Sequence, residues 1–395
     1  MQKLKEGFRW YGDNDPVPLQ FIRQSGATDV FASLHHIPYG ELWTVEEIEK
    51  HKAKIAACGL EWSVVESLPV TEDMKLRSGD FRRHTENYKQ SLRNLAKCGI
   101  TKIVYNFMPV LDWIRTDLHY KLPDGSQCLR FDPVQFAAFD IFVLKRDGAA
   151  EERTPEQVEK AKAFYESLDA AQKKAFERSI IDVFPGCKMG LEIGDVRKML
   201  ARYDGITPQK LKENLAEFLN EVAPVAEEVG AILAIHPDDP PFPVLGLPRI
   251  ASRVEDFEEM FAACPSKANT ICFCTGSLSA GAHNDISKMV DRLADRIGVA
   301  HLRSTQVNPD GSFFEAGHLE GRVPMVEVVE KLLKIQDKRL ANGGERLIFR
   351  PDHGRDMADD LLKPPPDNPG YSFIGRMKGL CEIRGVQTAL CSAQK

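Results

Sequence analysis

Four residues that could bind a metal follow or end apolar runs in the second half of the chain. His236 ends the run AILAIH, Cys274 ends TICFC, His301 lies near the end of GVAHL, and Asp352 follows LIFRP. Imidazole, thiolate and carboxylate groups are ligands of divalent transition metals. The four residues are too widely spaced for a zinc finger, but this spacing suits ligands that are delivered by separate strands. The sequence therefore predicts a metal site that is assembled by the fold.

Each of these residues also has an ordinary structural interpretation. A single histidine after a strand is more often a hydrogen-bonded structural residue, and Cys274 alone would be a small buried apolar residue. The segment Pro351-Asp352-His353-Gly354 alone is typical of a turn with a helix cap. Four such residues at four successive run ends favour the metal site. The mixed ligand set permits Zn²⁺, Fe²⁺ or Mn²⁺.

Further polar residues at run ends are candidates for contacts with a substrate. Trp10, Glu66 and Asn106 end earlier apolar runs. Arg303 follows His301 by two residues, and Arg115 lies in a polar loop. A guanidinium binds a carboxylate through two parallel hydrogen bonds, so we expect Arg303 and Arg115 to bind a substrate carboxylate. We expect Trp10 and Asn106 to contact the same substrate.

Eight short apolar runs are predicted to be the strands that position these residues. Most of them are almost continuously apolar, which is typical of strands that are covered on both faces. Helical patterns separate the runs, and this alternation favours a (β/α)8 TIM barrel over a doubly wound sheet. In such a barrel, functional residues lie at the carboxyl ends of the strands. The runs are 8–11, 29–34, 62–67, 102–107, 231–236, 270–274, 298–302 and 346–350.

One stretch interrupts this alternation. Residues 110–205 contain no convincing strand, a charged helical pattern over 155–179 and a second helix near 195–203. We interpret residues 1–395 as a single barrel domain with a helical insertion at 110–205, after the fourth strand. Insertions at that position lie on the C-terminal face of a barrel, so we expect this one to cover that face.

Composition and charge exclude several classes of protein. The chain has 395 residues, of which 43% are hydrophobic and 28% charged, and its net charge is −6. These values exclude a largely disordered chain and argue against nucleic acid as a partner. No apolar run is long enough to cross a membrane, and the N-terminal residues lack the apolar core of a secretory signal. Nine scattered cysteines do not form a disulfide framework, so we expect a cytoplasmic protein.

Several segments of the chain resemble the D-mannonate dehydratase family, in the longer form of that family. The similarity runs from end to end, and the middle insertion matches least well. Its long motifs make the resemblance highly specific. The segments that carry it are FRWYG at 8–12, YNFMP at 105–109, LPDGS at 122–126, AIHPDDPP at 234–241, GLPRI at 246–250, Cys274 before Gly-Ser, RPDHG at 350–354 and PGY at 369–371.

The resemblance implies a fold, a reaction and roles for residues. It implies a xylose isomerase-like barrel that dehydrates D-mannonate to 2-keto-3-deoxy-D-gluconate in hexuronate breakdown, with Mn²⁺ or Fe²⁺. The ligands of the family match His236, Cys274, His301 and Asp352. Its acid–base pair matches His353 and Tyr371. We assign Tyr371 as the base and His353 as the acid, and the reverse assignment stays open. We expect a homodimer.

Two other functions stay open on the sequence alone. A metal-dependent sugar isomerase or epimerase on the same barrel would conserve the mass of its substrate, whereas a dehydratase loses water. A protein that only binds a sugar acid would show saturable binding without turnover. The sequence lacks the fingerprints GxGxxG after a strand, GxxxxGK[ST], GxSxG and HExxH, which argues against dinucleotide, P-loop, serine hydrolase and zincin sites.

Overall fold

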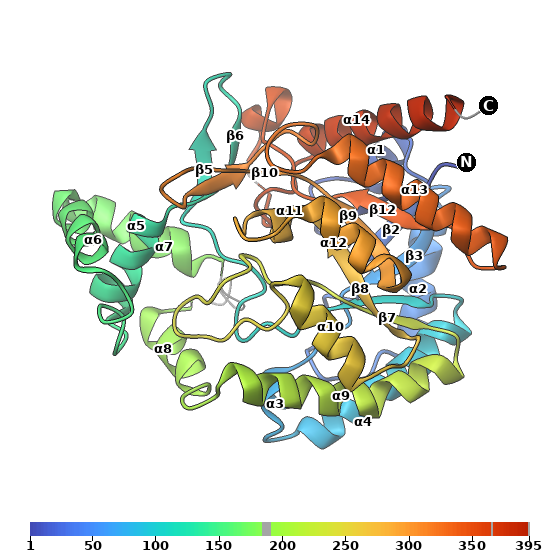
Figure 1. Ribbon diagram of the computed structural model, residues 1–395, viewed down its shortest axis with the longest axis horizontal. Coiled ribbons are helices and arrows are strands. Elements are labelled where there is room, and N and C mark those ends of the chain that lie inside the picture. Colours follow the sequence, from blue (N-terminus) through green and yellow to red (C-terminus); the bar gives the residue numbers. More distant parts are fainter. Residues whose placement is uncertain (184–190, 365, 394–395) are drawn as a thin grey trace.

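The computed structural model describes residues 1–183, 191–364 and 366–393. Part of the predicted insertion, including Cys187, and also Pro365 lie outside the described residues. Eight parallel strands close into a barrel in the order β1-β12-β9-β8-β7-β4-β3-β2 (Figure 1). They are β1 (Lys5–Arg9), β2 (Asp29–Ala32), β3 (Glu61–Glu66), β4 (Lys102–Tyr105), β7 (Ile232–Ile235), β8 (Asn269–Cys274), β9 (Ile297–Leu302) and β12 (Ile348–Pro351).

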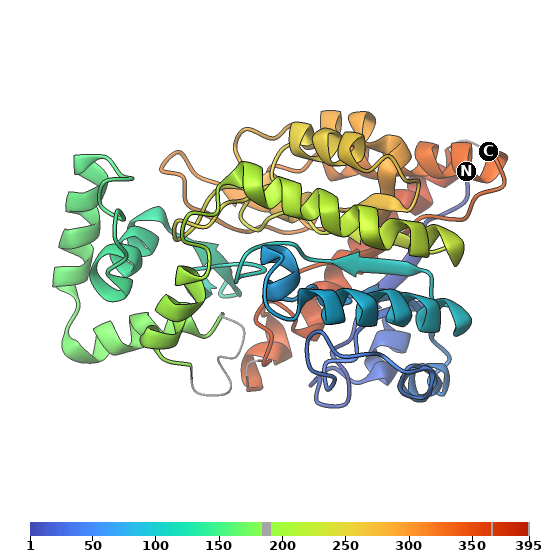
Figure 2. The ribbon, with the colours of Figure 1, turned by 90° about the horizontal axis from the view of Figure 1, so that it is seen from below.

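Each of the eight strands overlaps one of the apolar runs, so the predicted barrel is confirmed, although β1 begins and ends earlier than the run at 8–11. Helices connect the strands and surround the barrel, as Figure 2 shows for the long helix α9 (Pro208–Glu228). The Thr207 side chain accepts a hydrogen bond from the Lys210 backbone at the start of α9, and the helix continues through Pro224. Within the described ranges, no helix is both long and apolar enough to cross a membrane.

The remaining α-helices of the described residues range from five to 20 residues in length. Their bounds are α1 (Leu19–Gln24), α2 (Val45–Ala56), α3 (Glu72–Leu76), α4 (Phe81–Lys97), α5 (Pro133–Ala138), α6 (Pro155–Ser167), α7 (Ala170–Ile181), α8 (Ile193–Ala201), α10 (Val254–Ala263), α11 (Thr275–Ser279), α12 (Ile286–Arg292), α13 (Met325–Ala341) and α14 (Phe373–Ser392).

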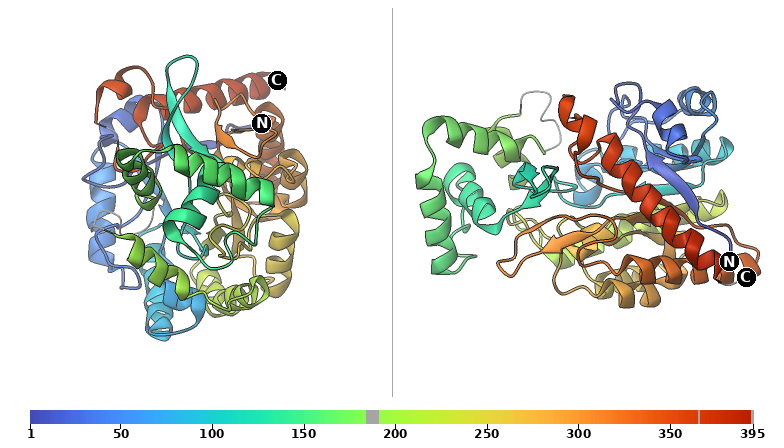
Figure 3. Two further views of the ribbon diagram at one scale, coloured as in Figure 1. Left: turned by 90° about the vertical axis from the view of Figure 1, so that its left-hand side faces the viewer. Right: turned by 90° about the horizontal axis from the view of Figure 1, so that it is seen from above.

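The segment after β4 differs from the prediction in two ways. It contains two strands, β5 (Asp117–Lys121) and β6 (Gln127–Phe131), which join β10 (Thr305–Val307) and β11 (Phe313–Glu315) in an antiparallel sheet. The single helix that was predicted over 155–179 is two helices, α6 and α7, because Asp169 caps a new helix with its side chain. The end-on view of Figure 3 shows the helices of this segment in front of one end of the barrel.

Side chains inside the barrel form two layers along the strand direction. The lower layer is an apolar cluster with one residue from each of seven strands: Phe31, Val64, Val104, Ala234, Cys272, Val299 and Ile348. On β1 the corresponding residue is Gly7, where an added Cβ would lie 2.3 Å from the ring of Phe31. The lower layer therefore fills the barrel and needs a glycine on β1.

The upper layer is polar. Successive side chains of a strand point to opposite faces, so the residue two positions further along each strand faces inward again. These residues are Arg9, Ser33, Glu66, Asn106, His236, Cys274, His301 and Arg350. They lie at the carboxyl ends of the strands, where polar and ionisable side chains replace the apolar side chains of the lower layer.

Candidate active site

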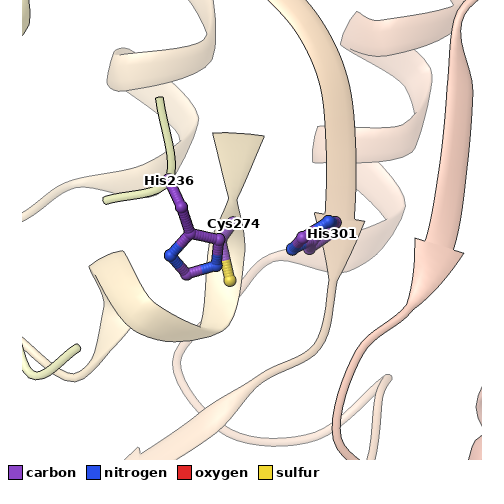
Figure 4. Close-up of side chains that lie close together, drawn as sticks. All are labelled: His236, Cys274 and His301. Carbon is purple, nitrogen blue, oxygen red and sulfur yellow. The ribbon is translucent and has the colours of Figure 1, made fainter. Parts of the chain in front are cut away.

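Three side chains of the upper layer form a potential metal site. Ligand atoms of His236, Cys274 and His301 all lie within 4.8 Å of one another. Figure 4 shows these three side chains close together, from the chain after β7, the end of β8 and the strand β9. Cys274 and His301 are fully buried, whereas His236 lines a cavity of about 600 Å³. Two imidazoles and a thiol in this space fit a divalent transition metal.

The fourth predicted ligand, Asp352, lies beside this group. Its Oδ2 is 3.4 Å from Sγ of Cys274, but Asp352 is not part of the three-residue group. Its carboxylate accepts hydrogen bonds of 2.6 Å from both Arg303 and Arg350. Burial by itself would raise the pKa of Asp352, but these arginines and His353 hold the pKa well below its usual value. Asp352 is thus an ionised carboxylate at the edge of the potential metal site.

Hydrogen bonds orient the two histidines of the group. Nδ1 of His236 lies 2.8 Å from the carbonyl oxygen of Pro237, so this nitrogen donates a proton to that oxygen and Nε2 is the ring atom left for a ligand bond. Nε2 of His301 is 3.0 Å from Glu66, and its Nδ1 is 3.2 Å from the Arg350 guanidinium. The Pro237 carbonyl and the Glu66 carboxylate are acceptors of the kind that fix the tautomer and the orientation of metal-binding imidazoles, whereas Arg350 contacts the second ring nitrogen of His301, which a metal would need.

The cavity also contains both predicted acid–base residues. His353 and Tyr371 line it, and their rings lie 5.0 Å apart in a T-shaped arrangement. Nδ1 of His353 is 3.1 Å from the carboxylate of Glu315, and the Tyr371 hydroxyl donates a 3.1 Å hydrogen bond to Asp352. Burial raises the pKa of Tyr371 well above its usual value, and the Asp352 charge raises it further. The phenol is therefore protonated in this arrangement.

Asn106 lines the cavity, but the other three residues that were predicted to contact substrate do not. Trp10 is buried in the hydrophobic core and stacks on His51 with ring centroids 5.0 Å apart. Arg115 and Arg303 are completely or almost completely buried behind the cavity wall. Their predicted role as substrate-carboxylate clamps does not fit this arrangement.

The two arginines bind carboxylates of the protein instead. Arg115 donates to Asp239 at 2.7 Å and to Glu315 at 3.1 Å. Arg303 donates to the same two carboxylates and to Asp352. Burial alone would raise the pKa of Glu315, but Arg303 and His353 beside it lower the pKa to about 2. These ion pairs connect the barrel to the second sheet, because Glu315 ends β11.

Replacing Arg303 with methionine is expected to destabilise the fold by roughly 3–5 kcal/mol, because it removes the buried cation that pairs with all three of Asp239, Glu315 and Asp352. Chemical denaturation with chelator present would measure this loss in the free energy of unfolding. The matched control is Arg292→Met, since Arg292 forms its ion pairs with Glu255 and Glu258 at the surface. An equal effect of the two substitutions would contradict a structural role for the buried network.

Sequence reasoning missed two residues that orient the site. Arg350 ends the predicted run 346–350 but was given no role, although its place two residues before Asp352 puts both on the inward face. Glu315 comes from the second sheet, and nothing in its local sequence distinguishes it from a solvent-exposed glutamate. Glu66, which was noted only as a run end, proves to bind both Arg350 and His301 at 3.0 Å.

A polar barrel mouth with two histidines and a cysteine that could hold a metal defines a class of protein: a TIM-barrel enzyme that acts on a small polar molecule. The family model of D-mannonate dehydratase (UxuA) matches residues 4–395, and the chain belongs to this family.

Individual relatives agree with this assignment. The chain is 50% identical over 391 residues to a protein named mannonate dehydratase from Marinomonas sp. (strain MWYL1), covering 98% of this chain and all of the relative. The crystal structure of mannonate dehydratase from Streptococcus suis serotype 2 superposes with a TM-score of 0.77 at 30% identity, covering 100% of this chain and 95% of that one. A xylose isomerase domain protein from Planctomyces limnophilus shares the fold, with a TM-score of 0.50, 11% identity and 98% of both chains covered.

Proposed function

We propose that this protein dehydrates D-mannonate to 2-keto-3-deoxy-D-gluconate and water, as a hydro-lyase of hexuronate breakdown. The observation that carries the proposal is one cavity lined by His236, which belongs to the His236–Cys274–His301 group, and by His353 and Tyr371, in a chain of the D-mannonate dehydratase family. His236, Cys274, His301 and Asp352 would hold Mn²⁺ or Fe²⁺. A divalent ion there would stabilise the negative charge that develops on substrate oxygens.

The reaction breaks the C2–H and C3–O bonds of the sugar acid. A base removes the C2 proton, an acid protonates the departing 3-hydroxyl so that it leaves as water, and the resulting enol becomes the 2-keto product. Both proton transfers need groups within hydrogen-bonding reach of the substrate. His353 and Tyr371 line the same cavity with adjacent rings, so one of them can remove the C2 proton while the other protonates the departing 3-hydroxyl.

The surroundings of the two residues favour His353 as the base and Tyr371 as the acid, the reverse of our first assignment. The ionised Glu315 accepts the Nδ1 proton of His353, which leaves Nε2 as the basic nitrogen of the ring. The pKa of Tyr371 is raised by burial, so the phenol has a proton to donate. Arg350 and Arg376 lie 5.8 and 5.3 Å from the Tyr371 ring and would stabilise the phenolate after transfer.

Assembly and location are part of the same proposal. We propose a homodimer that works in the cytoplasm. The eight cysteines within the described ranges are all free, which supports a reducing compartment.

The test is anaerobic purification, removal of metal, and assay of D-mannonate with Mn²⁺, Fe²⁺ and Zn²⁺ added separately. A dehydratase forms a 2-keto acid that is lighter than the substrate by one water. A product of unchanged mass would indicate an isomerase or epimerase instead. Saturable binding without turnover in all three arms would indicate a protein that only binds the sugar acid.

A further inference from the structure

The upper layer of the barrel contains two arginines, Arg9 and Arg350, and both line the cavity. Arg350 is neutralised by the protein itself, since it donates to Glu66 at 3.0 Å and to Asp352 at 2.6 Å. The direct ion-pair partners of Arg350 are thus carboxylates of the protein itself.

Arg9 differs from Arg350 in its partners. One terminal nitrogen of its guanidinium donates to the carbonyl oxygens of Trp10 and Phe31 at 2.9 and 3.1 Å, and the other is 2.8 Å from Nε2 of His35. All of these acceptors are neutral in that geometry. Among the described residues, no carboxylate forms an ion pair with Arg9, although the residue is only 4% exposed.

A buried guanidinium without a counter-charge is costly, and proteins pair such groups with an anion. The nearby carboxylates are already shared: Glu66 with Arg350 and His301, and Asp352 with Arg350 and Arg303. A carboxylate in direct contact with Arg9 would then be supplied by a molecule that enters the cavity. A carboxylate is the anion that a planar guanidinium fork recognises best, apart from phosphate.

We propose that Arg9 binds the carboxylate of the sugar acid and makes the site selective for acids over uncharged polyols. This inference rests on the proposed function for the identity of the ligand. Tyr11 and His35 position the guanidinium: Arg9 lies 4.2 Å from the centroid of the Tyr11 ring, and that ring stacks on His35 at 5.6 Å. Both side chains also line the cavity.

The position of Arg9 agrees with the chemistry of the substrate. The Tyr11 ring that packs against Arg9 also meets the Tyr371 ring edge-on, with centroids 5.0 Å apart. In a sugar acid the carboxylate carbon is bonded to C2, where the proton is removed, and C3 is the next carbon. A carboxylate on Arg9 would therefore place C2 and C3 on the side of the cavity that Tyr371 lines.

The test compares D-mannonate with D-mannitol, which has the same six-carbon chain but a CH2OH group in place of the carboxylate. Calorimetry on the metal-free protein measures binding of each ligand without turnover. We expect the parent protein to prefer mannonate by at least about 10-fold. Arg9→Gln should weaken mannonate binding by about 10²-fold and leave mannitol binding within about 2-fold. Arg9→Lys keeps the charge but not the planar guanidinium fork, so its affinity for mannonate should lie between those of the parent protein and Arg9→Gln.

Arg83→Gln is the matched control, because Arg83 is a surface arginine paired with Glu41, and it should leave both affinities unchanged. Equal loss of mannonate and mannitol binding in both Arg9 variants would overturn the proposal and assign Arg9 a structural role. Unchanged mannonate binding in Arg9→Gln would overturn it as well. Failure of the proposed function has a different signature, namely a metal-loaded parent enzyme that prefers mannonate but does not convert it.

Discussion

Replacing Cys274 with serine is expected to remove the bound divalent ion and the turnover of mannonate together. The thiolate is the softest of the proposed ligands, and its sulfur lies with ligand atoms of His236 and His301 inside 4.8 Å. A serine hydroxyl at this place stays protonated and is a poor ligand for a transition metal. Metal content by elemental analysis should fall well below one ion per chain, and kcat should fall by at least about 10³-fold.

The control for this substitution lies on the same strand. Cys272 is buried on the same inward face of β8, two residues below Cys274 and within the apolar layer. Cys272→Ala should keep both the metal and the activity. Loss of metal in Cys272→Ala would contradict the proposed site, and so would one bound metal ion per chain in Cys274→Ser. Alanine at His236, His301 or Asp352 should repeat the result of Cys274→Ser, and full activity in any two of these variants would reject the ligand set.

The strand ends could be predicted because they depend on local pattern. Barrel strands are covered on both faces, so their residues are almost all apolar, and a polar side chain at the end of such a run stands out. Side chains alternate between the two faces of a strand, so each inward residue of the lower layer is followed two positions later by one of the upper layer. Cys272 and Cys274 share a face in this way, as do Val299 and His301. This reasoning predicted the eight strands and brought His236, Cys274 and His301 to one end of the barrel.

The ion pairs could not be predicted because they join distant segments. Arg115 and Arg303 are of the residue type that binds a substrate carboxylate. The sequence does not reveal that in the folded chain they form ion pairs with Asp239 and Glu315 instead. The strands β5 and β6 were missed for a related reason. They form part of a small antiparallel sheet outside the barrel, and Asp117, His119 and Lys121 lack the apolar pattern of a barrel strand. Tertiary pairing decides such strands, not local propensity.

Removing only the hydroxyl of Tyr371 separates the two proton transfers. Tyr371→Phe keeps the ring and its packing against Tyr11 and His353, so the fold and metal content should be unchanged. If the phenol donates the proton to the departing 3-hydroxyl, kcat should fall by about 10²-fold or more. The base remains in place, so Tyr371→Phe should still exchange the C2 hydrogen of mannonate with solvent deuterium.

His353→Asn is the matched variant for the other transfer. It should keep the metal, lose turnover by about 10²-fold or more, and lose the C2 exchange, because the imidazole that removes the proton is gone. The opposite pattern, with exchange lost in Tyr371→Phe and kept in His353→Asn, would restore Tyr371 as the base despite its raised pKa. Loss of metal from His353→Asn would make His353 a ligand, and turnover within a few-fold of the parent in Tyr371→Phe would exclude the phenol from both steps. Since one deuterium measurement on two variants distinguishes these cases, the order of acid and base can be decided without a bound substrate structure.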